Sequence, residues 1–278
     1  MRRLAGMSGG NNPREADLTT RSHIRRRDEF TPASLAELCA GHIDLIWHRA
    51  FYGQSECAAV LPGIVEACEA ATYTLTNDLQ SLGTSIGEAN ESDSNATRYF
   101  QTAMQTTRQI RQIFGSQRSP ADTVRLQADE WWESGAMVGK SNGQLMLPNI
   151  IRRWPQGGQA NPHIDQREIP LLEHYALTRR IGVNVYLETP QPGDGGEIEF
   201  WQTFREENAY RFLKRSDYGL DRDKLGEPHE SILPGQGDLI LFDAARVHGV
   251  RQVREGSRVT SACFLGVRTP AHPLVVFA

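Results

Sequence analysis

Hydrophobic positions recur with helical spacing through the first half of the chain, over residues 31–139. The pair Thr31 and Pro32 is typical of a helix start, because the threonine side chain caps free backbone N–H groups and proline fits the first turn. An apolar stripe follows at spacings of mostly three and four residues, which predicts one buried helix face. The stripe consists of Leu35, Leu38, Cys39, Ile43 and Ile46.

Three further amphipathic stretches predict helices. The first follows Ser55 and is expected to break at Pro62, because proline lacks the backbone N–H that a helix interior needs. Residues 76–94 are rich in glycine, serine and asparagine and predict a loop. The other two helices are expected over about 96–115 and 119–132, because Gly115 is typical of a helix end and Ser119 with Pro120 is typical of a helix start.

After Lys140 the pattern changes to short β-branched segments that glycine and proline interrupt, which predicts strands. Helices first and strands second is an α+β order, unlike the alternation of a doubly wound sheet. We therefore expect one domain, residues 29–278, with helices packed outside a curved β-structure formed by residues 144–278. The expected strands are Gln144–Trp154, Arg180–Glu188, Glu197–Gln202, Asp238–Phe242, His248–Val253, Arg258–Val267 and Leu274–Phe277.

Two segments depart from this pattern. Residues 1–28 are rich in arginine and lack the apolar stretch of a secretory signal, so they predict a disordered arm. Residues 204–236 interrupt the strands with many charges, and a loop of this length is typically a functional lid or disordered. Aromatic and leucine residues among the charges would allow this segment to close with its apolar side down, so we favour a lid.

Composition and charge narrow the class of protein. Hydrophobic residues make up 39% and charged residues 23% of 278 residues, which is ordinary for a chain that buries a full core. The net charge of −4 argues against a nucleic-acid partner, and no apolar run reaches the roughly 20 residues that span a membrane. The four cysteines lack a CxxC spacing and predict buried free thiols in the cytoplasm. The oligomeric state stays open.

The candidate chemistry centres on two histidines and one aspartate. His163 and Asp165 lie in an extended segment, and side chains two residues apart in such a segment share a face. His248 follows the apolar strand expected at 238–242. Two imidazoles and one carboxylate can occupy one face of an iron coordination sphere, which leaves positions for a bidentate cosubstrate and O₂. The HxD pair alone is a weak signal, because it also occurs by chance.

Arg258 strengthens this interpretation. It shares one face of its expected strand with Thr260, inside the β-core. A buried arginine is costly unless a carboxylate meets it, and a dicarboxylate cosubstrate supplies such a group for bidentate binding. A solvent-facing Arg258, or one paired with a nearby glutamate, is the alternative.

Together these four positions resemble the signature of Fe(II)/2-oxoglutarate-dependent oxygenases. The segments 195–198 and 233–243 resemble two strands of the prolyl-hydroxylase-like branch of that family. The resemblance covers about residues 144–268. The size of the chain, its N-terminal helices and its long insertion are similar to small-molecule members, which include amino-acid hydroxylases and the related radical halogenases.

The resemblance implies a double-stranded β-helix, a cupin-like jelly roll that holds Fe(II) at one mouth, with 2-oxoglutarate and O₂ as cosubstrates. It implies hydroxylation of an unactivated C–H bond in a small molecule, such as an amino acid or derivative of specialised metabolism. Tyr186 as a plain core residue stays open. The implied site residues are His163, Asp165 and His248 for iron, Arg258, Thr260, Tyr186 and Asn184 for 2-oxoglutarate, and Arg152 or Arg167 for a substrate carboxylate.

Several alternatives compete with hydroxylation. The halogenase branch replaces the motif carboxylate with glycine or alanine, whereas Asp165 is present here, which favours hydroxylation or an allied oxidation such as desaturation. A zinc hydrolase with the same three ligands would leave Arg258 without a task. A non-catalytic β-helix binding module is the remaining class. The sequence does not name the substrate, and a peptide or nucleoside stays open.

Overall fold

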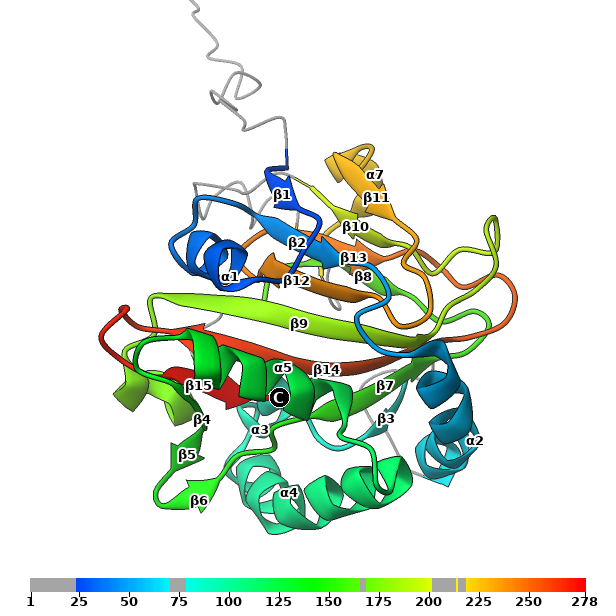
Figure 1. The fold of residues 1–278 in the computed structure, drawn as a ribbon. Coiled ribbons are helices and arrows are strands. Elements are labelled where there is room, and N and C mark those ends of the chain that lie inside the picture. Colours follow the sequence, from blue (N-terminus) through cyan, green and yellow to red (C-terminus); the bar gives the residue numbers. More distant parts are fainter. Residues whose placement is uncertain (1–23, 71–78, 166–168, 202–213, 215–218) are drawn as a thin grey trace, which may run out of the picture.

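Two β-sheets face each other, and helices cover the far side of the larger one (Figure 1). This arrangement comes from a computed structural model, which describes residues 24–70, 79–165, 169–201, 214 and 219–278. Among these residues no helix is long and apolar enough to cross a membrane.

The larger sheet has the strand order β1-β2-β12-β9-β14-β15-β4, and β7 joins it by pairing with β14 and carries β3 on its other edge. Strand β1 is parallel to β2 and β4 to β15, whereas the other pairs are antiparallel. The strands are β1 (Arg26–Arg27), β2 (Leu45–His48), β3 (Gln80–Leu82), β4 (Ala136–Val138), β7 (Ile150–Trp154), β9 (Arg179–Glu188), β12 (Leu239–Asp243), β14 (Arg258–Val267) and β15 (Leu274–Phe277).

The smaller sheet is antiparallel and has the order β11-β10-β13-β8. A separate hairpin, β5 (Lys140–Ser141) and β6 (Gln144–Leu145), precedes β7. The strands of the smaller sheet are β8 (Ala160–His163), β10 (Ile198–Phe200), β11 (Glu230–Ile232) and β13 (His248–Val250).

The helices begin where side chains can cap them. The Thr31 hydroxyl accepts a hydrogen bond from the Ser34 N–H, and the Ser119 hydroxyl accepts one from the Asp122 N–H. Gly115 ends the longest helix with a φ of 61°, a left-handed value that favours glycine. The helices are α1 (Pro32–Cys39), α2 (Gln54–Ala70), α3 (Ile86–Ala89), α4 (Asp93–Phe114), α5 (Pro120–Trp131), a 3₁₀ helix (Pro170–Tyr175) and α7 (Arg222–Leu225).

Strand β9 separates the two halves of the core, because its side chains alternate between its faces. Ile181, Val183 and Val185 point toward the helices and are fully buried there. Tyr186 points the other way and packs with Phe200 of the smaller sheet. The strands β7, β14, β9 and β12 thus face β8, β13, β10 and β11 as the two sheets of a jelly roll. The expected α+β class, with helices outside a double-stranded β-helix, is confirmed.

Three predictions about the helical half are wrong. The first helix ends at Cys39, and Ile46 belongs to β2, which pairs with β12. The second helix continues through Pro62 without a break. The expected loop 76–94 contains β3, α3 and the start of α4, although 71–78 lie outside the described residues. Partners distant in sequence determine β2 and β3, so local periodicity could not reveal them.

The strand half differs from expectation at its interruptions. The expected strand Gln144–Trp154 is divided into β6 and β7, because Pro148 cannot donate to a ladder. The insertion 204–236 supplies α7 and β11, and β11 pairs with β10, so this part belongs to the fold. Its residues 202–213 and 215–218 lie outside the described residues, and the lid interpretation stays a prediction. Likewise, β1 places the last residues of the expected arm 1–28 in the larger sheet, whereas residues 1–23 are not described.

Candidate metal centre and carboxylate pocket

Two neighbouring strands of the smaller sheet carry the candidate ligands. His163 ends β8 and His248 begins β13, and the two residues are directly paired across the antiparallel ladder. Asp165 follows two residues after His163 and points to the same side, as the extended spacing predicted. One ligand atom from each of the three side chains lies within 4.8 Å of the others. The sheet register therefore brings together residues that are far apart in the sequence.

The geometry of the cluster directs three ligand atoms toward a common point. Asp165 has one carboxylate oxygen 3.5 Å from His163 Nε2 and the other 3.2 Å from His248 Nε2. On the far side of each ring, Nδ1 meets a backbone carbonyl, that of Asn161 at 2.7 Å and that of Arg246 at 2.9 Å. Because a carbonyl can only accept, each Nδ1 carries the proton and each Nε2 offers its lone pair.

The charge states also suit metal binding. Burial lowers the pKa of His163, and the neighbouring His248 lowers it further, so the imidazole stays neutral. Burial alone would raise the pKa of Asp165, but the two imidazoles that face it hold that pKa well below its ordinary value. A neutral imidazole and an ionised carboxylate are the forms that bind a divalent cation.

Arg258 lies inside the jelly roll and is only 3% exposed. Its Nη2 donates a hydrogen bond to the Tyr186 hydroxyl at 3.2 Å, and its guanidinium carbon lies 4.9 Å from the centre of the Tyr186 ring. Its Nε is buried and has no hydrogen-bond partner, and none of the described carboxylates forms an ion pair with it. The solvent-facing alternative for Arg258 is therefore wrong. The buried guanidinium keeps a donor that a carboxylate ligand could meet.

Three of the other expected site residues lie in one row across three strands. Thr260 of β14 is the direct partner of Tyr186 on one side and of Arg152 on the other. Because paired residues share a face, all three side chains belong to the interior of the jelly roll. Asn184 lies on the same face of β9 and is half-buried. Arg167 is outside the described residues.

Sequence reasoning did not predict an aromatic contact between Phe242 and His248. The ring of Phe242 in β12 lies with its centre 4.6 Å from that of His248. A Cβ atom at Gly182 of β9 would be 2.5 Å from the Phe242 ring, so glycine is required for this packing. Neither residue carries a chemical signal in the sequence, because the contact depends on the register between β9 and β12.

A buried arginine next to the cluster was also missed. Arg180 of β9 is 9% exposed, and its Nη1 donates a hydrogen bond of 2.9 Å to the backbone carbonyl of Asp165. The sequence offers one signal for Arg180. It is an arginine at an inward-facing position of a strand that is otherwise mostly apolar.

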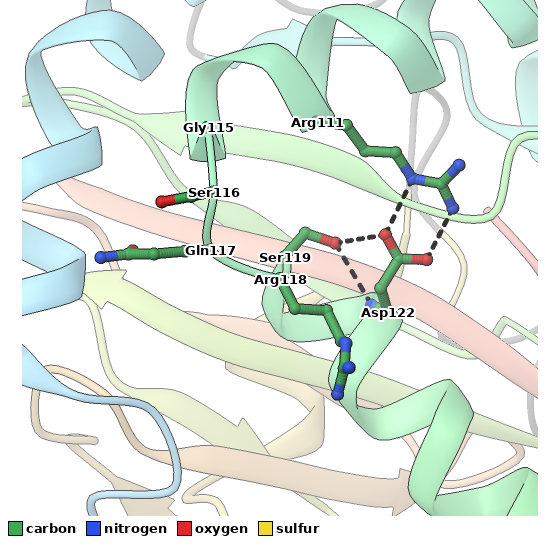
Figure 2. A pocket seen from close by; sticks show the side chains of 7 residues that line it. All are labelled: Arg111, Gly115, Ser116, Gln117, Arg118, Ser119 and Asp122. Atoms are coloured by element: carbon green, nitrogen blue, oxygen red, sulfur yellow. Dashed lines mark hydrogen bonds and ion pairs between the residues drawn. The ribbon is translucent and has the colours of Figure 1, made fainter.

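A surface hollow of about 390 Å³ lies between the end of α4 and the start of α5 (Figure 2). Its charged groups already bind one another: Arg111 donates two hydrogen bonds to the Asp122 carboxylate, which also accepts from the Ser119 hydroxyl. The hollow is on the helical side of the larger sheet, opposite the smaller sheet that carries the histidines. We therefore assign the candidate chemistry to the interior of the jelly roll.

Residues 149–266 match the family model of the 2OG-Fe(II) oxygenase superfamily, and this range contains the three candidate ligands and Arg258. This match covers less than half of the chain and shows that this part is similar to the superfamily. Among the proteins similar to this chain is L-isoleucine 3(1)-dioxygenase of Pantoea ananatis, 30% identical over 49% of this chain but only 50% of that protein's length. L-gamma-glutamyl-L-propargylglycine hydroxylase of Streptantibioticus cattleyicolor is 24% identical over 90% of this chain and 93% of its own length.

A solved structure has a similar fold. An N-substituted L-amino acid dioxygenase from Burkholderia ambifaria superimposes with a TM-score of 0.60, covering 92% of this chain and 97% of that one. Its sequence identity is 14%, so the similarity concerns the fold.

Proposed function

We propose that this protein is an oxygenase that uses Fe(II), 2-oxoglutarate and O₂ to hydroxylate a C–H bond of a small molecule. The observation that carries the proposal is the convergence of His163, Asp165 and His248 in a jelly roll whose interior also holds Arg258, a buried arginine that pairs with none of the described carboxylates. In the reaction, one oxygen atom of O₂ enters the hydroxyl group of the product. The other enters succinate, which forms from 2-oxoglutarate with release of CO₂.

The residues fit the metal and the cosubstrate. Two ligand atoms at about 2.1 Å from a metal and at right angles lie about 3 Å apart, close to the 3.2 Å between Asp165 and His248. Two neutral imidazoles and one carboxylate are the ligand set typical of non-haem Fe(II) oxygenases. The unpartnered Nε of Arg258 and the Tyr186 hydroxyl would hold the distal carboxylate of 2-oxoglutarate, with help from Thr260.

In this mechanism Fe(II) and 2-oxoglutarate supply the oxidising chemistry, and the chain supplies binding, orientation and exclusion of water. The protonated Nδ1 atoms of both histidines keep their rings aimed at the metal through backbone carbonyls. Phe242 covers one side of His248 and keeps water from that ring. Burial of Arg258 strengthens its attraction for the cosubstrate carboxylate.

We further propose that the substrate carries a carboxylate, as amino acids and their derivatives do. Arg152 supports this proposal, because it shares the interior face with Thr260 and its buried Nε has no hydrogen-bond partner. The names of two relatives refer to an L-amino acid and to a γ-glutamyl amino acid. The buried free cysteines agree with action in a reducing cytoplasm. We further propose that residues 29–278 form a single domain that acts without nucleic acid or membrane partners.

A metabolite screen for substrate-dependent succinate release tests the proposed function. We expect a carboxylate-bearing compound to raise succinate formation and to give a product heavier by one oxygen atom in mass spectrometry. A product lighter by two hydrogen atoms would indicate desaturation instead. A hydrolysis product formed without consumption of 2-oxoglutarate would contradict the proposal and favour a zinc hydrolase.

We predict that Arg152→Gln weakens substrate binding and leaves 2-oxoglutarate binding intact. Loss of a charge-assisted hydrogen bond of about 1.5–3 kcal/mol should raise KM for the substrate about 10- to 150-fold. Comparing the substrate with its primary amide provides the control, because the variant should no longer prefer the free acid. An unchanged preference, or a selective loss of 2-oxoglutarate affinity, would contradict this role of Arg152.

A further inference from the structure

We propose that the buried ion pair of Arg246 and Asp44 is a positioning device for the metal ligands. It fixes one short turn of backbone that holds both His248 and Asp165 in place. The inference rests on the proposed metal site. It concerns residues on two segments, one of which, around Asp44, lies outside the part of the chain that matches the family model.

The turn at residues 243–247 connects β12 to β13 and contacts two of the three ligands. The Ala244 carbonyl accepts a hydrogen bond of 3.0 Å from the Asp165 N–H, and the Arg246 carbonyl meets His248 Nδ1 at 2.9 Å. The Arg246 N–H closes the turn with a hydrogen bond of 3.0 Å to the Asp243 carbonyl. A shift of this turn would therefore move an imidazole and a carboxylate together.

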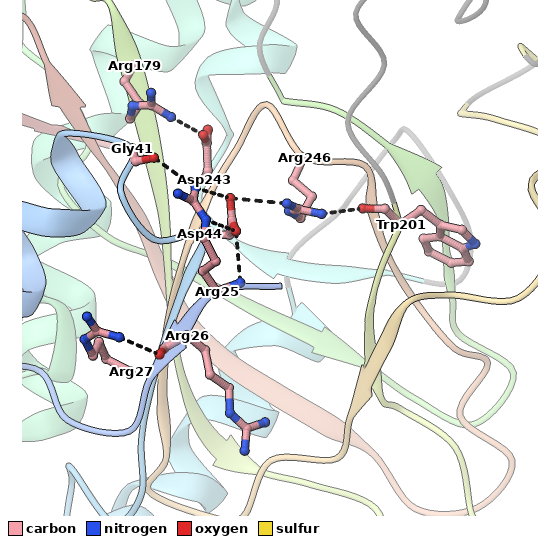
Figure 3. A network of polar contacts seen from close by, with 9 residues as sticks. All are labelled: Arg25, Arg26, Arg27, Gly41, Asp44, Arg179, Trp201, Asp243 and Arg246. Carbon is pink, nitrogen blue, oxygen red and sulfur yellow. Dashed lines mark hydrogen bonds and ion pairs between the residues drawn. The ribbon is translucent and has the colours of Figure 1, made fainter. Parts of the chain in front are cut away.

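The Arg246 guanidinium anchors the turn to the rest of the fold. Arg246 is 3% exposed. Its Nη2 lies 3.2 Å from a carboxylate oxygen of Asp44, and its Nη1 donates a hydrogen bond of 2.9 Å to the Trp201 carbonyl (Figure 3). The backbone of Asp44 holds the same turn, because its carbonyl accepts a hydrogen bond of 3.1 Å from the Asp243 N–H. The turn is thus fixed by a side chain and by main-chain contacts from two sides.

Asp44 is itself held in the ionised form that this role requires. Burial alone would raise its pKa, but hydrogen bonds from the Arg25 side chain and backbone, together with the charge of Arg246, bring the pKa below its ordinary value. Arg25 approaches with Nε and Nη2 at 3.1 Å from the two carboxylate oxygens and donates a further hydrogen bond to the Gly41 carbonyl. The carboxylate therefore sits between two arginines (Figure 3).

This geometry predicts an effect on metal affinity as well as on folding. The carbonyls that orient the ligands belong to the backbone, so a side-chain substitution cannot remove them. The Arg246 guanidinium, which fixes their turn, is therefore the group to change. Partners that orient metal ligands are typically worth roughly 10- to 100-fold in metal affinity. The Arg246 side chain does not contact a ligand itself but fixes the carbonyl that does, so we expect a loss of metal affinity at the lower end of that range. A purely structural ion pair would lower the melting temperature and leave the affinity of the folded protein unchanged.

The test is an anaerobic Co(II) titration of the full chain, followed by visible absorption. We expect Arg246→Met to weaken Co(II) binding about 10-fold in protein that is folded by circular dichroism. Arg246→Lys should regain part of this loss, because an ammonium group can reach one of the two acceptors. Asp44→Asn should resemble Arg246→Met with a smaller effect. Arg111→Met is the matched control, since it breaks the bidentate pair with Asp122 and should lower stability without changing Co(II) affinity.

Two results would overturn the proposal. Co(II) affinity within twofold of wild type in folded Arg246→Met would make the ion pair structural only; if that variant does not fold, the same result in Arg246→Lys and Asp44→Asn decides. Failure of the wild-type protein to bind Co(II) would instead remove the metal site, and the proposed function with it. The wild-type titration therefore separates failure of the metal site from failure of the positioning role.

Discussion

The Asp165→Ala variant is expected to lose both divalent-metal binding and hydroxylation. Asp165 is the only anion of the three converging side chains, and its two oxygens lie 3.5 Å and 3.2 Å from the imidazole nitrogens of His163 and His248. Without it, two neutral imidazoles remain to hold a dication. Anaerobic Co(II) titration and the succinate assay at saturating Fe(II) measure the two losses separately.

Glu255→Ala serves as the control for Asp165→Ala, because Glu255 is an exposed carboxylate shortly before β14. It should keep wild-type metal affinity and turnover. Near-wild-type turnover of Asp165→Ala at saturating Fe(II) would show that the metal is held elsewhere.

Arg258→Met should weaken 2-oxoglutarate binding about 10- to 150-fold, because the buried guanidinium provides a charge-assisted contact worth about 1.5–3 kcal/mol. Methionine fills the volume of the aliphatic stem without the charge, so the effect reports the missing cation. Tyr186 contributes a neutral hydroxyl at 3.2 Å from Arg258 Nη2. Tyr186→Phe should therefore cost less, about 2- to 12-fold. Titration of 2-oxoglutarate into the anaerobic metal-loaded protein measures both constants.

Metal affinity provides the control for these two variants. Both should bind Co(II) as wild type does, because neither side chain belongs to the ligand cluster. An unchanged 2-oxoglutarate affinity in Arg258→Met would return this arginine to a purely structural role and leave the cosubstrate pocket unassigned.

The ligand cluster could be predicted because short-range geometry dictates much of it. The HxD spacing places His163 and Asp165 on one side of an extended segment, and the structure shows both there. The strand predicted at Arg258–Val267 has the same bounds in the structure, since ten mostly apolar and β-branched residues leave little ambiguity. The family resemblance supplied what spacing could not, namely that His248 belongs to the same ligand set as His163 and Asp165; in the structure the two histidines are paired in the smaller sheet.

The supporting residues could not be predicted, because their roles depend on contacts between distant segments. Asp44 lies between α1 and β2, in a region for which the periodicity predicted one helix, and its partner Arg246 follows about two hundred residues later in the sequence. Arg25 belongs to a segment that composition alone marks as a disordered arm. Local patterns cannot show which buried arginine meets which carboxylate.

An anaerobic titration of Fe(II) and 2-oxoglutarate tests the central claim most directly. We predict that Fe(II) alone gives no visible band, and that adding 2-oxoglutarate produces the weak visible charge-transfer absorption of a metal-chelated 2-oxo acid. The same band should be absent with Asp165→Ala and should need more 2-oxoglutarate with Arg258→Met. Absence of the band in the wild-type protein at saturating Fe(II) and 2-oxoglutarate would contradict the account.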